Sequence, residues 1–349
     1  MARSTNPTAE AHRDLLKDFF DDTARFKFHS LVAHGIYGSA CRIKYHDPKG
    51  PALTNFLVKM SFPGKYHIDA MKTEKEYLKK MQANRHIVQL VNIPDNPLED
   101  PLLNEDVDPD SWIIMEWLNH GTIGEFLMTA MAYLNSRGQK LPNRLLWRFF
   151  LCLIRGAIAM AWPDKRENVD DAVEESGIVH NDLHLNNVLM GAPPEDDEHT
   201  ITPILKIIDF GCAGQIPSES ASTGVQKNIY DLGNIMATLI ALDDTDPRGR
   251  LPNPPKFTRN GVEMNTDCEK LVPAPAGVDP QLVELVCACT ASDFNNRPTL
   301  PHLLAQASAA VRDRGVAFYN NNPRETDDKV KKIWQQLTMS GPYADPTDA

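Results

Sequence analysis

The chain has 349 residues, of which 42% are hydrophobic and 24% are charged. This composition is typical of a globular protein, and the length allows two domains or one bilobal domain with sizeable cores. The formal net charge of -11, from 36 basic and 47 acidic residues, argues against nucleic acid or an anionic membrane as the main partner. The six cysteines show no metal-ligand spacing, and the N-terminus lacks an apolar signal core. We therefore expect a soluble cytoplasmic or nuclear protein with reduced thiols.

The first predicted elements are a helix and a pair of strands. Residues 8–24 form an amphipathic pattern that predicts a helix. Residues 26–45 then alternate between apolar and polar, which predicts two strands joined by a loop that contains Gly35 and Gly38. Glycines let backbone N–H groups approach a phosphate, because no Cβ stands in the way. As a lone signal this loop is weak, since most glycine pairs in hairpins are ordinary turns.

A lysine inside an apolar run comes next. The predicted strand 55–60 contains Lys59, and an ammonium group is costly to bury without a partner or a phosphate. A helix is predicted over residues 68–82, with an apolar stripe formed by Met71, Leu78 and Met81. At about 100° per residue Glu74 falls within that stripe, whereas Glu76 lies on roughly the opposite side. We expect Lys59 to pair with Glu74; a strand-edge lysine that reaches solvent is the alternative.

Two short motifs follow at a spacing that brings them together. The stretch His180-Asn181-Asp182-Leu183-His184-Leu185-Asn186-Asn187 precedes Asp209-Phe210-Gly211. Between them, residues 188–190 and 204–208 predict two short strands joined by a turn. A base on the first loop and a metal ligand after the second strand would therefore face each other. Carboxylate and amide oxygens are hard ligands of the kind that Mg²⁺ prefers.

On these motifs and their order, the chain resembles the protein-kinase-like superfamily. The resemblance is to a divergent eukaryotic Ser/Thr protein kinase-like domain with a shortened activation segment. It implies an α+β, bilobal protein-kinase-like fold with a small antiparallel-sheet N-lobe and a mostly helical C-lobe. The expected parts are an N-terminal helical extension over 1–24, the N-lobe over 25–116, the C-lobe over 117–315, and a C-terminal tail with one docked helix over 316–349.

The resemblance also implies phosphoryl transfer from ATP with Mg²⁺ as the metal. Asp182 would accept or orient the proton of the attacking hydroxyl. Asn187 and Asp209 would be the metal ligands. Lys59, positioned by Glu74, would contact the α and β phosphates of the nucleotide.

The adenine site is implied in the same way. Residues 113–118 resemble the strand that leads into the hinge between the lobes. Met115 would be the gatekeeper beside the adenine, and the backbone of Glu116 and Leu118 would meet the adenine edge. Leu189 would form the floor under the base.

The chain departs from the family pattern at two positions and lacks one motif. His184 stands where protein Ser/Thr kinases usually have lysine, and Asp-Leu-His resembles small-molecule kinases such as the aminoglycoside phosphotransferases. An imidazole would contact the γ-phosphate less strongly than lysine near neutral pH, and a loop histidine bound to backbone is the alternative. No Ala-Pro-Glu motif occurs between Asp209 and Gly233. Asn228 replaces the usual aspartate, and Arg297 matches the arginine whose usual glutamate partner is missing.

The remaining elements are predicted to be helices. The apolar stretch 145–162 contains Arg148 and Arg155, which favours a core helix over a membrane span. Asp279-Pro280 is a predicted N-cap and N1 pair that opens a helix. Further helices are predicted over 229–240, 299–314 and 325–337.

Three hypotheses about function remain open. The first is an active ATP-dependent kinase that acts on a hydroxyl acceptor, expected to be a protein Ser or Thr. The second is a small-molecule kinase on the same fold. The third is a nucleotide-binding pseudokinase or regulatory scaffold, against which the intact Asp182 and Asp209 argue. The expected partners are ATP and the acceptor, with no nucleic acid and no membrane.

Overall fold

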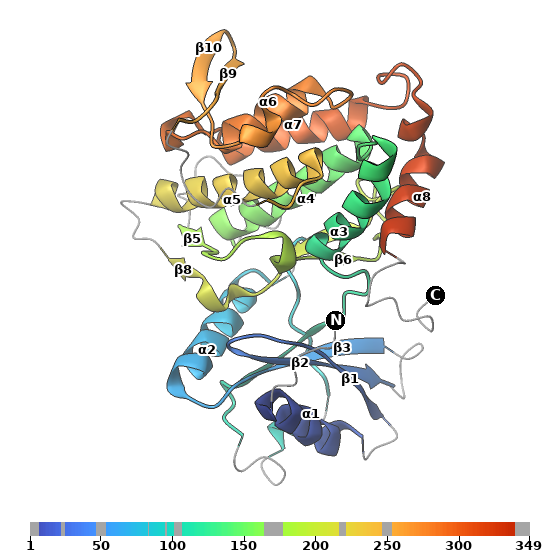
Figure 1. Cartoon of the computed structure of the whole chain (residues 1–349). Coiled ribbons are helices and arrows are strands. Elements are labelled where there is room, and N and C mark those ends of the chain that lie inside the picture. The colour runs from blue at the N-terminus through green and yellow to red at the C-terminus, as the bar shows by residue number, and fades with distance from the viewer. Residues whose placement is uncertain are drawn as a thin grey trace. The chain divides into compact units, whose positions relative to one another are not determined.

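The computed structural model (Figure 1) describes residues 7–21, 25–46, 54–82, 84–94, 96–100, 107–163, 177–215, 221–245 and 253–338. The chain divides into two compact units. Unit 1 consists of Met1–Ala83, Val88–Trp117 and Asp209–Ala213, and unit 2 consists of Asn84–Ile87, Leu118–Ile208 and Gly214–Ala349. Among the described residues, no helix combines the length and the apolar character needed to cross a membrane.

Unit 1 is built on a four-stranded antiparallel sheet with the strand order β1-β2-β3-β4. The strands are β1 (Phe26–His34), β2 (Gly38–Tyr45), β3 (Thr54–Ser61) and β4 (Trp112–Glu116). Alternation along β3 buries Phe56, Val58 and Met60 on one face and leaves Leu57 and Lys59 half-buried on the other. The sheet therefore has one core face and one face on which polar side chains can act.

Helix α1 (Pro7–Phe20) packs against β1 and β2 and contributes to the apolar core of unit 1. The ring of Phe20 lies 5.4 Å from that of Phe26 and 5.8 Å from that of Phe56, both in edge-to-face geometry. A hydrogen bond of 2.9 Å between His12 and Ser39 adds a polar contact to β2. The helix predicted over 8–24 is present, but it ends at Phe20.

Helix α2 (Lys65–Lys80) lies in the same unit and buries Met71, Glu74 and Leu78. These residues form the stripe that the periodicity predicts, and Glu76 is exposed as expected. The helix contacts β3, β4 and the short 3₁₀ turn η4 (Phe210–Cys212). One face of α2 thereby meets two segments that are far apart in sequence.

Unit 2 is mainly helical. Its helices are α3 (Ile123–Leu134), α4 (Asn143–Ala161), α5 (Ala221–Ala241), α6 (Pro280–Cys289), α7 (Leu300–Asp313) and α8 (Asp327–Thr338). Helix α4 is buried along nearly its whole length and contacts α5 and α7, and Figure 1 shows α4 and α5 side by side. A helix that is apolar on nearly all sides needs such a central position, because every face must be covered.

Three two-stranded ladders complete unit 2. They pair β5 (Ile178–Val179) with β8 (Gly214–Gln215), β6 (Val188–Gly191) with β7 (Ile204–Ile207), and β9 (Lys256–Arg259) with β10 (Val262–Asn265). The β6–β7 ladder is the pair of short strands that the sequence predicts. The β9–β10 hairpin was not predicted, although Asn260 and Gly261 both have positive φ, as a tight hairpin turn requires.

Short 3₁₀ turns connect these elements. They are η1 (Pro97–Glu99), η2 (Asn135–Arg137), η3 (Leu185–Asn187), η6 (Glu269–Leu271), η7 (Phe294–Asn296) and η8 (Pro323–Glu325). Turn η8 holds the tail in place, because the buried Glu325 carboxylate accepts hydrogen bonds from the backbone N–H groups of Asn143 and Arg144. Helix α8 follows and contacts α3. Trp334 on α8 donates to the carbonyl oxygen of Ile201 at 2.9 Å.

A buried carboxylate ties three helices of unit 2 together. Asp279 is the predicted N-cap of α6 and accepts from the N–H of Gln281 at 3.1 Å. Its other oxygen accepts from Trp147 at 2.9 Å and from Tyr319 at 2.8 Å, and it pairs with Arg314. Burial opposes ionisation of this carboxyl, but the three donors outweigh burial and hold its pKa below the ordinary value.

We expect Asp279→Ala to lower the free energy of unfolding by about 3 kcal/mol, because it removes the acceptor of the buried Trp147 N–H and the ion-pair partner of Arg314. Urea denaturation followed by circular dichroism measures this loss. The control is Asp313→Ala, since Asp313 forms only an exposed ion pair with Arg312. A control variant as unstable as Asp279→Ala would contradict the assignment.

The same carboxyl makes a pH prediction. Because its pKa is lower in the folded chain than in the unfolded chain, its contribution to stability is complete above about pH 4 and is lost at more acidic pH. The stability difference between the wild type and Asp279→Asn should therefore shrink as the pH falls below that value.

Candidate active site

The candidate site of unit 1 is centred on Lys59. Its ammonium donates to Glu74 at 2.7 Å and to Asp209 at 2.8 Å. The side chain of Glu74 is 2% exposed, that of Lys59 18%, and that of Asp209 36%. The predicted pair of Lys59 and Glu74 is therefore present. Asp209 is the member of the group that remains open to solvent and to a ligand.

Burial and charge act in opposite directions on this group. Burial alone would lower the pKa of Lys59, but the two carboxylates outweigh burial and raise that pKa above its ordinary value. Burial raises the pKa of Glu74, and the ammonium partly opposes this rise. Because both carboxylates stabilise the ammonium, Lys59 stays charged near neutral pH.

The strand register explains which side chains accompany Lys59. Ala40 is the direct partner of Lys59 in the β2–β3 ladder, and Leu57 is the direct partner of Met115 in the β3–β4 ladder. Direct partners point to the same face, and so do residues two apart on one strand. Ala40, Leu57, Lys59 and Met115 therefore share the face opposite the α1 core. The small side chain of Ala40 and the larger one of Leu57 therefore lie on a single surface.

The two glycines of the β1–β2 loop differ in the space around them. A Cβ on Gly38 would lie 2.2 Å from the carbonyl oxygen of Met60, so only glycine allows β2 and β3 to approach here. A Cβ on Gly35 would meet nothing within 4 Å. The loop is closed by a hydrogen bond of 2.9 Å from the N–H of Gly35 to the carbonyl of Gly38. The open space beside Gly35 is the place where a phosphate could approach the backbone.

Asp209 has an unusual backbone conformation. Its φ of 66° lies in the left-handed region, which costs a non-glycine residue energy and is frequent at functional positions. Phe210, the next residue, is fully buried, and its turn contacts α2. The buried ring and the ion pair to Lys59 together hold the Asp209 carboxylate in place.

The loop of residues 180–187 in unit 2 is anchored by buried hydrogen bonds. Asn228 accepts from the N–H of His180 at 3.1 Å and donates to the carbonyl of Ile178 at 2.8 Å. The His180 ring donates from Nε2 to the carbonyl of Ile208 at 2.9 Å, and its Nδ1 accepts from the N–H of Asp182. His180 is therefore a structural residue of the loop.

The polar side chains of this loop lie close to one another. The amide nitrogen of Asn187 donates to the carbonyl of Asp182 at 2.8 Å and to its carboxylate at 3.1 Å. The Nδ1 atom of His184 accepts from the N–H of Asn186, and its Nε2 lies 3.6 Å from Asp182 Oδ1. His184 thus contacts both the backbone of the loop and the side of the predicted base.

The sequence analysis missed Gly124 on α3. A Cβ at this position would lie 2.0 Å from the side-chain oxygen of Asn186, so the glycine makes room for the loop. The capping box formed by Thr122 and Glu125 sets the start of α3 and therefore the place of this glycine. The capping pattern is visible in the sequence, whereas the packing of Asn186 on α3 is not.

The predicted adenine contacts belong to both units. Met115 and Glu116 end β4 in unit 1, where the N–H of Glu116 donates to Gln89 O at 3.0 Å. In unit 2, Leu118 is buried, and Leu189 is the half-buried member of the otherwise buried strand β6. Alternation along β6 therefore leaves Leu189 on the less covered side of that strand.

A comparison with known families identifies the kind of domain that these residues belong to. The family model described as protein tyrosine and serine/threonine kinase matches residues 26–230. The chain belongs to this kinase family. The match covers more than half of the chain and includes every residue predicted for the site. The four-stranded antiparallel sheet and the largely helical remainder confirm the predicted α+β kinase fold.

Two departures from the kinase pattern have structural explanations. Asn228 binds the loop through both a donor and an acceptor, and an aspartate at this position could only accept. Arg297 donates to the carbonyls of Ala291 and Gln226 at 3.0 and 2.9 Å, and its guanidinium stacks on the ring of Tyr230. Backbone oxygens and an aromatic face thus contact the arginine in place of the missing glutamate.

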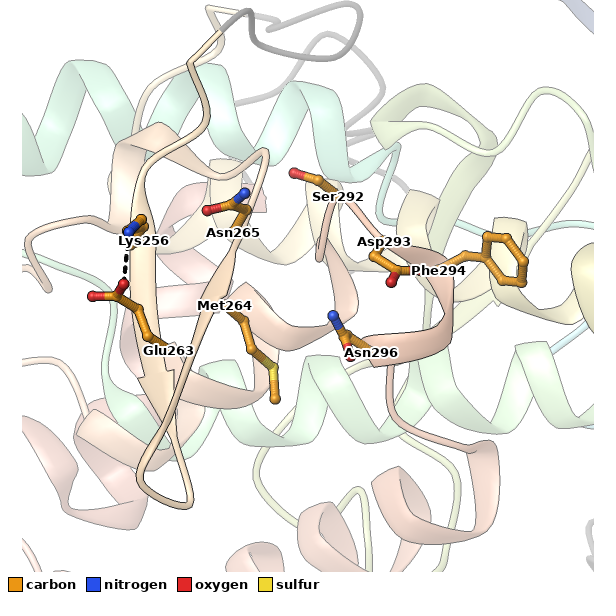
Figure 2. A pocket seen from close by; sticks show the side chains of 8 residues that line it. All are labelled: Lys256, Glu263, Met264, Asn265, Ser292, Asp293, Phe294 and Asn296. Atoms are coloured by element: carbon orange, nitrogen blue, oxygen red, sulfur yellow. Dashed lines mark hydrogen bonds and ion pairs between the residues drawn. The ribbon is translucent and has the colours of Figure 1, made fainter.

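A separate hollow of about 700 Å³ lies between the β9–β10 hairpin and η7 (Figure 2). It is lined by Lys256, Glu263, Met264, Asn265, Ser292, Asp293, Phe294 and Asn296. Lys256 and Glu263 form an ion pair on one side of it. None of the predicted catalytic or nucleotide-binding residues lines this hollow.

We expect Gly38→Ala and Gly35→Ala to differ in stability. The Cβ of the first variant would overlap the Met60 carbonyl and should cost about 1–3 kcal/mol of unfolding free energy. The second should change stability by less than about 0.5 kcal/mol, because its Cβ enters open space. Urea denaturation of both variants checks this, and equal losses would contradict the assignment.

We expect Asn228→Asp to destabilise the chain by about 2 kcal/mol, although aspartate is the usual kinase residue. A carboxylate would keep the bond to His180 but would face the Ile178 carbonyl without a hydrogen to donate. Asn296→Asp, at an exposed position, is the matched control. Denaturation measures both, and a gain of stability in Asn228→Asp would show that the donor is not needed.

Proposed function

We propose that this chain is an active kinase that transfers the γ-phosphate of ATP to a hydroxyl acceptor. The observation that carries the proposal is the Lys59 ammonium held between Glu74 and Asp209. A buried ion pair of this kind adds little net stability, because desolvation offsets most of the attraction. The ion pair instead fixes positions, because it holds one cation and one partly exposed carboxylate on the same face of the sheet.

Unit 1 supplies the groups that would hold the nucleotide. Lys59 would donate to phosphate oxygens, and the open space at Gly35 would admit a phosphate to the backbone. Met115 and Glu116, with Leu118 and Leu189 of unit 2, would contact the adenine. Lys59 stays charged near neutral pH, as an anionic ligand requires.

The donor set fits a magnesium ion. The Asp209 carboxylate is partly exposed, and Asn187 uses its amide nitrogen for its contacts with Asp182, which leaves its oxygen for a cation. Both atoms are hard oxygens of the kind that Mg²⁺ prefers. A bound Mg²⁺ would neutralise phosphate charge during transfer.

Asp182 would orient the acceptor hydroxyl and accept its proton. Its side chain is about half exposed, and the Asn187 amide holds one carboxylate oxygen at 3.1 Å. His184 lies beside the other oxygen and would donate to the acceptor or to the transferred phosphate. The anchoring of the loop by Asn228 fixes the Asp182 backbone, so the role of Asp182 depends on positioning.

A protein Ser or Thr is the acceptor we favour, because the family acts on protein hydroxyls. A small-molecule hydroxyl is a second candidate, favoured by the short connection from β8 to α5. Strand β8 ends at Gln215 and helix α5 begins at Ala221. Peptide substrates of kinases lie on a longer segment, as the resemblance implies.

We expect Asp182→Asn to lower phosphoryl transfer by roughly 10²–10⁴-fold while nucleotide binding stays unchanged, because it removes the base and leaves Lys59 in place. The measurement uses the purified chain, Mg²⁺, labelled ATP and a cell extract that is afterwards separated into protein and metabolite fractions. Nucleotide binding is measured by thermal stabilisation. Asp244→Asn, at an exposed position, is the matched control.

Four outcomes decide the proposal. Label in the protein fraction identifies a protein kinase, and label in the metabolite fraction identifies a small-molecule kinase. ATP-dependent stabilisation of the wild type without transfer to either fraction would instead identify a pseudokinase. Undiminished transfer by Asp182→Asn would remove Asp182 from the mechanism.

A further inference from the structure

Three buried side chains with metal-binding atoms meet in unit 2, apart from the kinase residues. They are His86, Cys152 and His199, and their nitrogen and sulfur atoms all lie within 4.8 Å of one another. His86 follows α2 in sequence, Cys152 lies in the middle of α4, and His199 lies on the loop between β6 and β7. All three are at most 2% exposed. Three distant segments thus bring three donors to one point in the core.

The hydrogen bonds indicate which ring nitrogens carry a lone pair. His86 donates from Nδ1 to the carbonyl oxygen of Leu205 at 3.2 Å. His199 donates from Nδ1 to the carboxylate of Asp196 at 2.8 Å. A carbonyl and a carboxylate can only accept, so each neutral imidazole carries its lone pair on Nε2. Nε2 of His199 lies 3.2 Å from the Cys152 sulfur, and the donor atoms of the three side chains lie within 4.8 Å of one another.

The described part of the chain does not satisfy all of these atoms. The Cys152 sulfur lies 3.2 Å from Nε2 of His199, so a thiol hydrogen could serve that nitrogen. Nε2 of His86 is buried and has no hydrogen-bond partner in the described part of the chain. One thiol hydrogen cannot serve two lone pairs, and buried imidazole nitrogens are normally satisfied. A cation at the centre would use all three donors together.

The surroundings resemble a metal site in a further respect. Asp196 holds Nδ1 of His199 and also accepts from the backbone N–H groups of Glu198 and His199. A carboxylate behind a histidine ligand orients the ring and raises its basicity. Arg85 donates to Asp196 at 2.5 Å, and Arg155 pairs with Glu198. The two arginines balance the charges of the two carboxylates. The surroundings therefore add no net charge to a cation and a thiolate bound at the cluster.

Burial prepares both imidazoles as neutral ligands, because burial lowers the pKa of His86 and of His199. Burial also raises the pKa of Cys152 to about 12, so without a metal it is a thiol. A bound metal ion deprotonates a coordinating thiol. Binding of a metal ion would therefore convert the Cys152 thiol to a thiolate.

We propose that His86 Nε2, Cys152 Sγ and His199 Nε2 bind a thiophilic transition-metal ion, Zn²⁺ or Cu⁺. Ligand atoms around such an ion lie roughly 3.3–3.8 Å apart, given metal bonds of about 2.0–2.3 Å. The sulfur and Nε2 of His199 already lie at 3.2 Å, and the three donor atoms lie within 4.8 Å of one another, so side-chain shifts would bring all three to this spacing. The bound ion would fasten the segment Asn84–Ile87 and the β6–β7 loop to α4.

The two ions differ in charge and in coordination. Zn²⁺ normally takes four ligands, so it would need a water or a further side chain. Cu⁺ favours soft thiolate ligands, and with one thiolate it leaves the cluster neutral. Both ions use the same three donors, and separate titrations distinguish them.

The test uses the full chain purified without a polyhistidine tag. The protein is stripped with a chelator and titrated with Zn²⁺, with Cu⁺ under reducing conditions, and with Co²⁺ as a spectroscopic probe. We expect one equivalent of Zn²⁺ or Cu⁺ to bind and to raise the melting temperature. Co²⁺ should give the charge-transfer absorption of a thiolate ligand. Asp196→Asn should lower the affinity by about 10–100-fold, because an amide lacks the charge with which the carboxylate raises the basicity of the His199 ring.

Two matched variants decide the assignment. Cys152→Ala should lose the charge-transfer band and the stoichiometric binding. Cys289→Ala should keep both, because Cys289 is equally buried and belongs to no such cluster among the described residues. Circular dichroism shows whether each variant is folded, and His86→Gln tests the second ligand if Cys152→Ala does not fold. Absence of stoichiometric binding by the wild type, or equal binding by Cys152→Ala, would overturn the proposal.

Discussion

One buried cation determines the arrangement of unit 1. Moving an ammonium and a carboxylate out of water costs several kcal/mol per ion, so Lys59 and Glu74 can be covered only as partners. Asp209 completes the group from a segment 150 residues further along the chain. Strand β3, helix α2 and turn η4 must therefore all be correctly positioned for this group to form. The left-handed backbone of Asp209 is tolerated because the ion pair with Lys59 and the buried ring of Phe210 hold this residue in place.

In unit 2, buried hydrogen bonds rather than buried charges position the candidate functional residues. The loop that contains Asp182 depends on His180 and Asn228, which are both buried and which bind backbone atoms. In the sequence Asn228 replaces the usual family aspartate. Its two hydrogen bonds explain how it serves this position, because the amide anchors the loop with a donor that a carboxylate lacks. A departure from a family pattern has to be judged by the contacts that replace the usual ones.

Local periodicity accounts for what the sequence predicted correctly. The 3.6-residue repeat separated Glu74 from Glu76, and the Asp279-Pro280 cap marked the start of α6, because both signals depend on a few neighbouring residues. The β9–β10 hairpin was missed although its Asn260-Gly261 turn carries a local signal. The partners of Arg297 could not be predicted at all, since backbone carbonyls are present at every position and only the fold selects two of them.

The cluster of His86, Cys152 and His199 shows the limit of spacing rules most clearly. Such rules find metal ligands that lie a few residues apart, whereas these ligands come from three segments, and 47 residues separate the two closest in sequence. What identifies them is chemistry: two imidazole lone pairs and one thiol, all buried and close together. The ligand types also distinguish the two predicted metal sites by the ion that each prefers. Nitrogen and sulfur donors select Zn²⁺ or Cu⁺, and the oxygens of Asn187 and Asp209 select Mg²⁺. The buried ion would therefore stabilise the fold whether or not the kinase site turns over.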